Sequence, residues 1–130
     1  QNTFSYIIKI ADCVVVTLVP EAGDGIQAMK AGLMEIGDIF VVNKSDRGGA
    51  EKLAREVDYM VSLKKQISQR KIKVLIAQAE NDIGIDQIID EISSFKKIHL
   101  GDSNIFNNVV ISWLLNKTIY TQTILIKNEL

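Results

Sequence analysis

Residues 10–42, which read IADCVVVTLVPEAGDGIQAMKAGLMEIGDIFVV, decide the fold of this 130-residue chain. The run at residues 10–19 is almost continuously apolar and β-branched, which is typical of a strand covered on both faces in a parallel sheet. Pro20 ends this run, and Asp24 is placed to cap a helix whose apolar residues recur at helical spacing. A second apolar run follows at Ile39–Val42. Strand, helix and strand within about 30 residues predict one βαβ unit.

The same alternation continues towards the C-terminus. Apolar residues recur at helical spacing over residues 50–66 and 85–96, and a short strand is predicted between them at residues 72–77. Strands that alternate with helices predict an α/β fold with a parallel sheet.

The last quarter of the chain follows a different pattern. Four of the 33 residues at 98–130 are charged, against 27 of the preceding 97. We therefore divide the chain into a partial domain at residues 1–97 and a divergent tail at residues 98–130. Within the tail, an apolar face predicts a helix over residues 105–114, and alternation predicts a strand over residues 118–127.

The overall composition excludes several classes of protein. The 15 basic and 16 acidic residues give a net charge of -1, so we expect neither nucleic acid nor a membrane surface as a partner. No run of 18 apolar residues is present, and the N-terminus lacks the order of a signal peptide. Cys13 is the single cysteine, which fits a reducing compartment and predicts a cytoplasmic protein.

The sharpest motif is Asn43-Lys44-Ser45-Asp46, which stands directly after a predicted strand, where parallel sheets bind ligands. The Asp46 carboxylate can accept hydrogen bonds from the N1–H and 2-amino groups of guanine, which adenine does not offer. The stem of Lys44 would lie along the base, and Asn43 would tie the loop to neighbouring backbone. The motif predicts a guanine site, and its alternative is a simple polar turn.

Two weaker signals accompany this motif. A backbone N–H of the loop Gln78-Ala79-Glu80, which follows the third predicted strand, can reach the guanine carbonyl oxygen, and the small Ala79 leaves room for the ring. On the first helix, three polar residues share one face at intervals of three: Asp24, Gln27 and Lys30. Taken alone, each signal is also explained by an ordinary loop or a solvated helix face.

Residues 10–53 closely resemble the core of the MeaB/ArgK family of P-loop GTPases, bacterial relatives of the methylmalonic aciduria type A protein, and a weaker resemblance continues to about residue 97. The resemblance implies a three-layer α/β P-loop NTPase fold. The residues that match the two base-contacting loops of the family are Asn43, Lys44, Asp46, Gln78, Ala79 and Glu80. The residues that match its third switch segment, which relays the nucleotide state to a partner enzyme, are Asp24, Gln27 and Lys30.

The resemblance also implies an activity and partners. Members of the family bind GTP and GDP with magnesium, hydrolyse GTP in the cytosol, and chaperone the adenosylcobalamin-dependent methylmalonyl-CoA mutase. They usually form homodimers. For the protein to which this sequence belongs we therefore expect the same substrate, methylmalonyl-CoA mutase or a related cobalamin enzyme as the partner, and a homodimer.

The phosphate-binding half of such a GTPase is missing from this sequence. Phosphoryl transfer needs a phosphate loop and ligands for magnesium, and no GxxxxGK[ST] motif occurs between Gln1 and Leu130. We expect both elements upstream, so we predict no catalytic or metal-ligating residue here, an incomplete fold and a fragment that is inactive alone. The missing strands would expose the apolar run Val14–Val19 at a sheet edge unless the tail or a second chain covers it, so we expect a dimer or an aggregate.

A second hypothesis belongs to a different class. The chain could be a non-enzymatic α/β protein-interaction module in which residues 43–46 form only a turn. A protein partner would then bind the helix face with Asp24, Gln27 and Lys30. The substitution Asp46→Asn separates the two hypotheses, because an interaction module should show no nucleotide effect.

Overall fold

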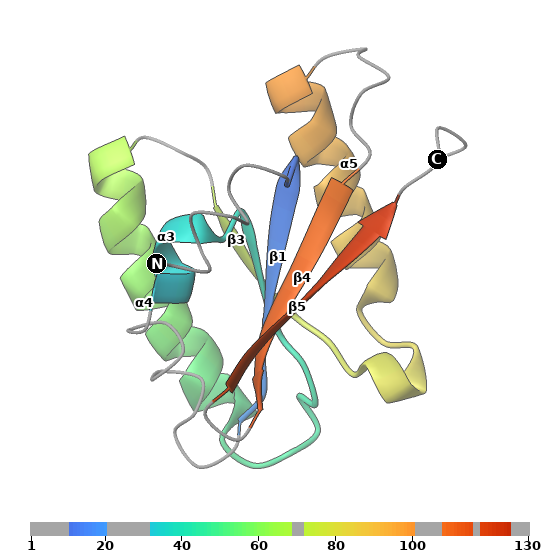
Figure 1. Cartoon of the computed structure of the whole chain (residues 1–130). Helices are drawn as coiled ribbons and strands as arrows, with labels where there is room; N and C mark the ends of the chain where they lie inside the picture. The colour runs from blue at the N-terminus through green and yellow to red at the C-terminus, as the bar shows by residue number, and fades with distance from the viewer. Residues whose placement is uncertain (1–10, 21–31, 69–71, 101–107, 116–117, 126–130) are drawn as a thin grey trace.

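The computed structural model describes residues 11–20, 32–68, 72–100, 108–115 and 118–125. Its sheet, shown in Figure 1, has five strands: β1 (Cys13–Leu18), β2 (Ile39–Val42), β3 (Lys73–Ile76), β4 (Asn108–Leu115) and β5 (Thr118–Leu125). The described helices are α3 (Met34–Ile36), α4 (Ala50–Ser68), α5 (Ile85–Leu100) and the short 3₁₀ helix η2 (Ala79–Asn81). None of the helices in the described part of the chain is long and apolar enough to cross a membrane.

The strands are ordered β3-β2-β1-β4-β5 across the sheet. β1 pairs in parallel with both β2 and β4, and β2 pairs in parallel with β3, whereas β5 runs antiparallel to β4. Where β1 and β2 begin, Asp38 binds Val14 twice: its Oδ2 accepts from the Val14 N–H, and its own N–H donates to the Val14 carbonyl, each at 2.9 Å. The predicted parallel α/β sheet is therefore confirmed.

Helices cover both faces of the sheet, and each face has its own apolar core (Figure 1). Alternate residues of β1 point to opposite faces, as the pleat of a strand requires. One core joins buried residues of the strands to those of α3 and α4: Val14, Val16, Leu18, Phe40, Val42, Ile36, Leu53, Val57 and Val61. The other joins buried strand residues to half-buried residues of α5: Cys13, Val15, Ile39, Val41, Ile88, Ile92 and Phe95. The result is an open three-layer arrangement consistent with part of a P-loop NTPase fold.

The tail corrects one prediction from the sequence. Residues 108–115 form strand β4, so the helix predicted over residues 105–114 is wrong there. The cause is a non-local pairing, because residues 109–113 of β4 pair with residues 13–17 of β1. The strand predicted over residues 118–127 is present as β5. Of the two expected ways to cover this edge of β1, the tail or a second chain, the structure shows the tail, because β4 pairs with β1.

Two smaller corrections concern the helices. The apolar residues that recur at helical spacing over residues 50–66 and 85–96 include Leu63 and Ile89, and this pattern predicts that both face inward. In the structure both are exposed, at 45% and 41%. The inward face of α4 is narrower than the apolar pattern suggests and runs through Leu53, Val57 and Val61. The inward face of α5 excludes Ile89 because its neighbour Ile88 already packs on the sheet, and adjacent helical residues point about 100° apart.

Candidate functional site

The strands β1, β2 and β3 end at the same edge of the sheet, the lower edge in Figure 1, and the loop after β2 is fixed to both neighbours. The Asn43 N–H donates to the carbonyl of Leu18 at the end of β1, at 2.8 Å. The Ser45 N–H donates to the carbonyl of Ala77, just after β3, at 3.1 Å. These two bonds hold the start of the motif at residues 43–46 across the ends of three strands.

The side chain of Asn43 joins the two loops that were predicted to contact a base. Its Oδ1 accepts a hydrogen bond from the backbone N–H of Ala79, with a donor–acceptor distance of 2.9 Å. This is the contact to neighbouring backbone that the sequence predicts for Asn43. The structure therefore brings the segment at 43–46 and the segment at 78–80 together at one edge of the sheet.

The second loop has a tightly bonded backbone of its own. Gln78 and Ile83 exchange two backbone hydrogen bonds, at 2.9 and 3.1 Å, which close the loop at its base. Within it, the Asn81 N–H donates to the Gln78 carbonyl at 3.0 Å, and the Asn81 side chain donates to Gln78 Oε1 at 3.0 Å. Asp82 adopts left-handed backbone, with φ at 55°. The loop thus presents Ala79 and Glu80 on a defined turn, both of them exposed.

The first loop has a strained residue at its centre. Lys44 adopts left-handed backbone with φ at 55°, and its carbonyl accepts from the N–H of Arg47 at 3.0 Å, which forms the turn that leads into α4. Lys44 and Asn43 are half-buried, whereas the side chain of Asp46 is exposed. Among the described residues, none makes a hydrogen bond or ion pair with the Asp46 carboxylate. A carboxylate presented in this way can accept hydrogen bonds from a ligand.

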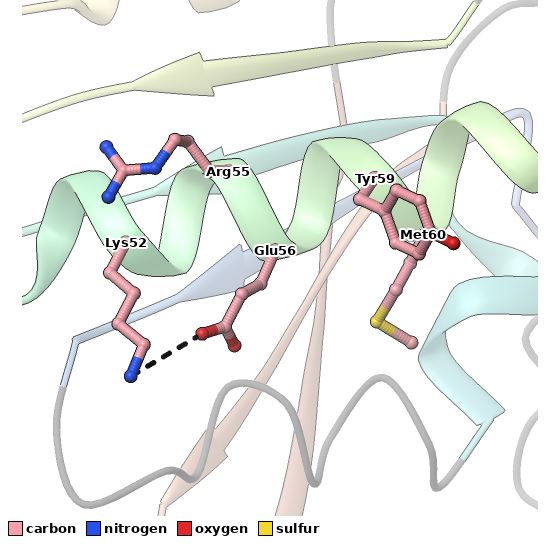
Figure 2. A pocket seen from close by; sticks show the side chains of 5 residues that line it. All are labelled: Lys52, Arg55, Glu56, Tyr59 and Met60. Atoms are coloured by element: carbon pink, nitrogen blue, oxygen red, sulfur yellow. Dashed lines mark ion pairs between the residues drawn. The ribbon is translucent and has the colours of Figure 1, made fainter.

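A shallow hollow elsewhere on the surface does not belong to these loops. It has a volume of about 390 Å³, and the described residues that line it all belong to α4: Lys52, Arg55, Glu56, Tyr59 and Met60. Figure 2 shows these side chains along a single helix, with an ion pair of 4.0 Å between Lys52 and Glu56. None of the predicted base-contacting residues at 43–46 and 78–80, all of which the structure describes, lines this hollow.

Three predicted site residues lie outside the described part of the chain, and one residue that shapes the second loop was not predicted. Asp24, Gln27 and Lys30 lie outside the described residues. Gly84 closes the second loop with φ at 86°, and a Cβ added there would lie 2.5 Å from the carbonyl oxygen of Ile76. The sequence signal for it was a single glycine immediately before a helix, which also occurs in ordinary loops.

The sequence that forms these two loops also resembles known proteins. The sequence model of the family described as "Methylmalonyl Co-A mutase-associated GTPase MeaB" matches residues 3–110. The chain belongs to this family. The MeaB match includes both loops and ends within β4, at its third residue.

Individual relatives agree with the family. The chain is 38% identical over 94 residues to a Pyrococcus horikoshii protein named "Putative GTPase", a match that covers 70% of this chain and 30% of the relative. It is 30% identical over 94 residues to the GTPase ArgK of Escherichia coli, covering 69% of this chain and 28% of the relative. A Pyrococcus abyssi protein with the same printed description is 51% identical over 57 residues, covering 44% and 18%. The matches thus span less than a third of each relative's length. No solved structure gives a significant match.

Proposed function

We propose that this chain is the guanine-recognition part of a MeaB/ArgK-type GTPase. The observation that carries the proposal is the hydrogen bond between Asn43 Oδ1 and the Ala79 N–H, which holds the two loops together beside the exposed Asp46. This arrangement stands at the carboxyl edge of a parallel sheet, where α/β folds bind ligands, in a chain that belongs to a GTPase family.

Each residue has a distinct task in the proposed complex. The Asp46 carboxylate accepts two hydrogen bonds from the N1–H and 2-amino groups of guanine. Lys44 lays its methylene stem along the base, and the loop of Gln78, Ala79 and Glu80 borders the carbonyl oxygen of the base. Adenine is rejected because it would leave the carboxylate desolvated without donors, a loss that discriminates by orders of magnitude.

The activity of the whole protein is part of the same proposal. The whole protein would hydrolyse GTP in the cytoplasm and act as a chaperone of adenosylcobalamin-dependent methylmalonyl-CoA mutase, in keeping with the family's printed description. Its working form would be a homodimer. The segment with Asp24, Gln27 and Lys30 would relay the nucleotide state. The 130-residue chain alone hydrolyses no GTP, because its sequence has no GxxxxGK[ST]. The residues that the structure describes include no group of three or more His, Cys, Asp or Glu side chains suited to a metal ion, so we assign them no part in holding magnesium.

The substitution Asp46→Asn tests base recognition. An amide can donate to the 2-oxo group of xanthine, so the variant should lose at least about tenfold in GDP affinity and gain affinity for xanthosine diphosphate, since a hydrogen bond to a charged group is worth roughly 1.5–3 kcal/mol. Asp82→Asn is the matched control, because Asp82 is another exposed carboxylate of this edge, at a left-handed position that asparagine tolerates. Binding of GDP that is unchanged by Asp46→Asn, or absent from the unsubstituted chain, refutes the proposal and favours the interaction module.

A further inference from the structure

We infer that Asn81 is a positioning residue of the guanine site. It acts through Gln78 on the peptide group between Gln78 and Ala79, whose N–H joins the second loop to the first. The inference rests on the proposed function and adds a residue outside the two motifs at 43–46 and 78–80 on which base affinity depends. Three sets of contacts carry it: those of this peptide group, the side-chain bond between Asn81 and Gln78, and the turn that follows Ala79.

The peptide group between Gln78 and Ala79 is hydrogen-bonded at both ends. Its N–H donates to Asn43 Oδ1 at 2.9 Å. Its carbonyl accepts from the N–H groups of Asn81 and Ile83, at 3.0 and 3.1 Å. Hydrogen bonds that a peptide carbonyl accepts polarise the N–H of the same group and strengthen the bond that this N–H donates. The N–H that is predicted to meet the guanine oxygen is therefore oriented and strengthened from its carbonyl end.

The side chain of Asn81 holds this peptide group in a second way. Its Nδ2 donates to Gln78 Oε1 at 3.0 Å, so Asn81 is bonded to both the backbone and the side chain of Gln78. The side-chain bond keeps the N–H of Asn81 at the Gln78 carbonyl. Gln78 is half-buried, whereas Asn81 is exposed. A residue at the surface of the loop thus fixes the orientation of a residue that borders the proposed base site.

The turn after Ala79 brings Asn81 within reach of Gln78. Residues 79–81 form the 3₁₀ helix η2, and Gln78 directly precedes it. Side chains three residues apart lie above one another in a 3₁₀ helix. The N–H of Asp82 donates to the Ala79 carbonyl at 3.1 Å, and the left-handed backbone of Asp82 ends the helix. The pair of Gln78 and Asn81 therefore belongs to the geometry of the loop itself and forms before a base arrives.

A double-mutant cycle tests the inference. Guanosine, which presents the base without phosphate charges, is titrated into the ¹⁵N-labelled 130-residue chain while the amide signal of Ala79 is followed by NMR. We expect Asn81→Ala to weaken guanosine binding about three- to fivefold, as the loss of one exposed neutral hydrogen bond does. In the background of Gln78→Met the same substitution should have no further effect, because the acceptor of the Asn81 side chain is already gone.

Two further variants separate positioning from stability. Asn81→Asp keeps a bond to Gln78, because the Gln78 amide can rotate and donate to the carboxylate, so the affinity should return to within about twofold of the unsubstituted chain. Gln87→Ala truncates another exposed amide, on α5, and should leave the affinity unchanged. Urea unfolding is recorded for each variant, since a role in stability alone would move the unfolding midpoint and leave the affinity of the folded chain as it is.

Failure of the inference is distinguishable from failure of the proposed function. The inference is overturned if Asn81→Ala binds guanosine as tightly as the unsubstituted chain, if its loss is the same in the Gln78→Met background, or if Asn81→Asp loses as much as Asn81→Ala. In these cases a loss of guanosine binding in Asp46→Asn shows that base recognition itself stands. If guanosine moves no amide signal of the unsubstituted chain, the proposed function and the inference are both refuted.

Discussion

The shape of the second loop, at residues 78–84, depends directly on Gly84. We predict that Gly84→Ala destabilises this loop and separates it from the first. The backbone φ of Gly84 is 86°, a left-handed value that an alanine side chain rarely adopts. The added Cβ would also lie 2.5 Å from the Ile76 carbonyl oxygen and 3.0 Å from the Cα of Ala77, both backbone atoms at the end of β3.

The magnitude of this destabilisation follows from the backbone strain at residue 84 and from the steric overlap of the added Cβ. Holding alanine at a left-handed φ costs roughly 1–2 kcal/mol. Relieving an overlap with backbone requires a shift of the strand end or of the loop, at a cost of about 1–3 kcal/mol, because no flexible side chain can yield. We therefore expect a loss of about 2–5 kcal/mol in the free energy of unfolding. The same shift should break the bond between Asn43 Oδ1 and the Ala79 N–H and lower the affinity for guanosine.

Urea unfolding and amide hydrogen exchange measure both effects. Gly48→Ala is the matched control, since its added Cβ meets no atom of the described residues within 4 Å and its backbone is not left-handed. The control should change stability by less than about 0.5 kcal/mol. If Gly84→Ala unfolds at the same urea concentration as Gly48→Ala and keeps the exchange rate of the Ala79 amide, the loop geometry described here is wrong.

Two further substitutions test individual contacts. Asn43→Ala removes the acceptor of the Ala79 N–H and should cost about 1 kcal/mol, with faster hydrogen exchange at the Ala79 amide; an unchanged rate would show that the bond does not form in solution. Lys64→Met removes two hydrogen bonds from Nζ to the carbonyls of Met34 and Glu35 in α3, at 2.6 and 2.9 Å, and should cost about 1–2 kcal/mol in urea unfolding. Its control, Lys52→Met, removes only an exposed ion pair of 4.0 Å and should be neutral within about 0.5 kcal/mol, so equal losses in both variants would contradict the proposed role of Lys64.

The elements that could be predicted from the sequence are those whose burial is set by local pattern. β1 and β2 are apolar on both faces because helices cover both sides of the sheet, and this produces the continuous runs at residues 10–19 and 39–42. The stripe that begins at Leu53 is buried on one side only and therefore shows helical periodicity, which predicted α4 to within two residues of its end. In each case the residue pattern and the tertiary environment agree.

The tail could not be predicted in this way because its conformation depends on a distant partner. The apolar residues at 105–114 satisfy a helical face, but Val109, Val110 and Ile111 are also β-branched and suit a strand. Pairing with β1, about 95 residues earlier in the chain, decides between the two. If this edge of β1 were unpaired, its backbone N–H and C=O groups would be exposed. Pairing with β4 provides hydrogen-bond partners for them.

In the candidate site, one hydrogen bond could likewise not be predicted from the sequence. The residue types at 43–46 and 78–80 could predict that the two loops serve one base, with a backbone N–H of the second loop directed at the guanine carbonyl. They could not predict that the Ala79 N–H would already be bonded to Asn43. Because that N–H carries one hydrogen, a guanine oxygen directed at it has to take the place of Asn43 Oδ1 or share the bond with it. Replacing one neutral acceptor by another changes the free energy little. The loops can therefore be held in their arrangement before a base arrives, and discrimination is left to the exposed carboxylate of Asp46.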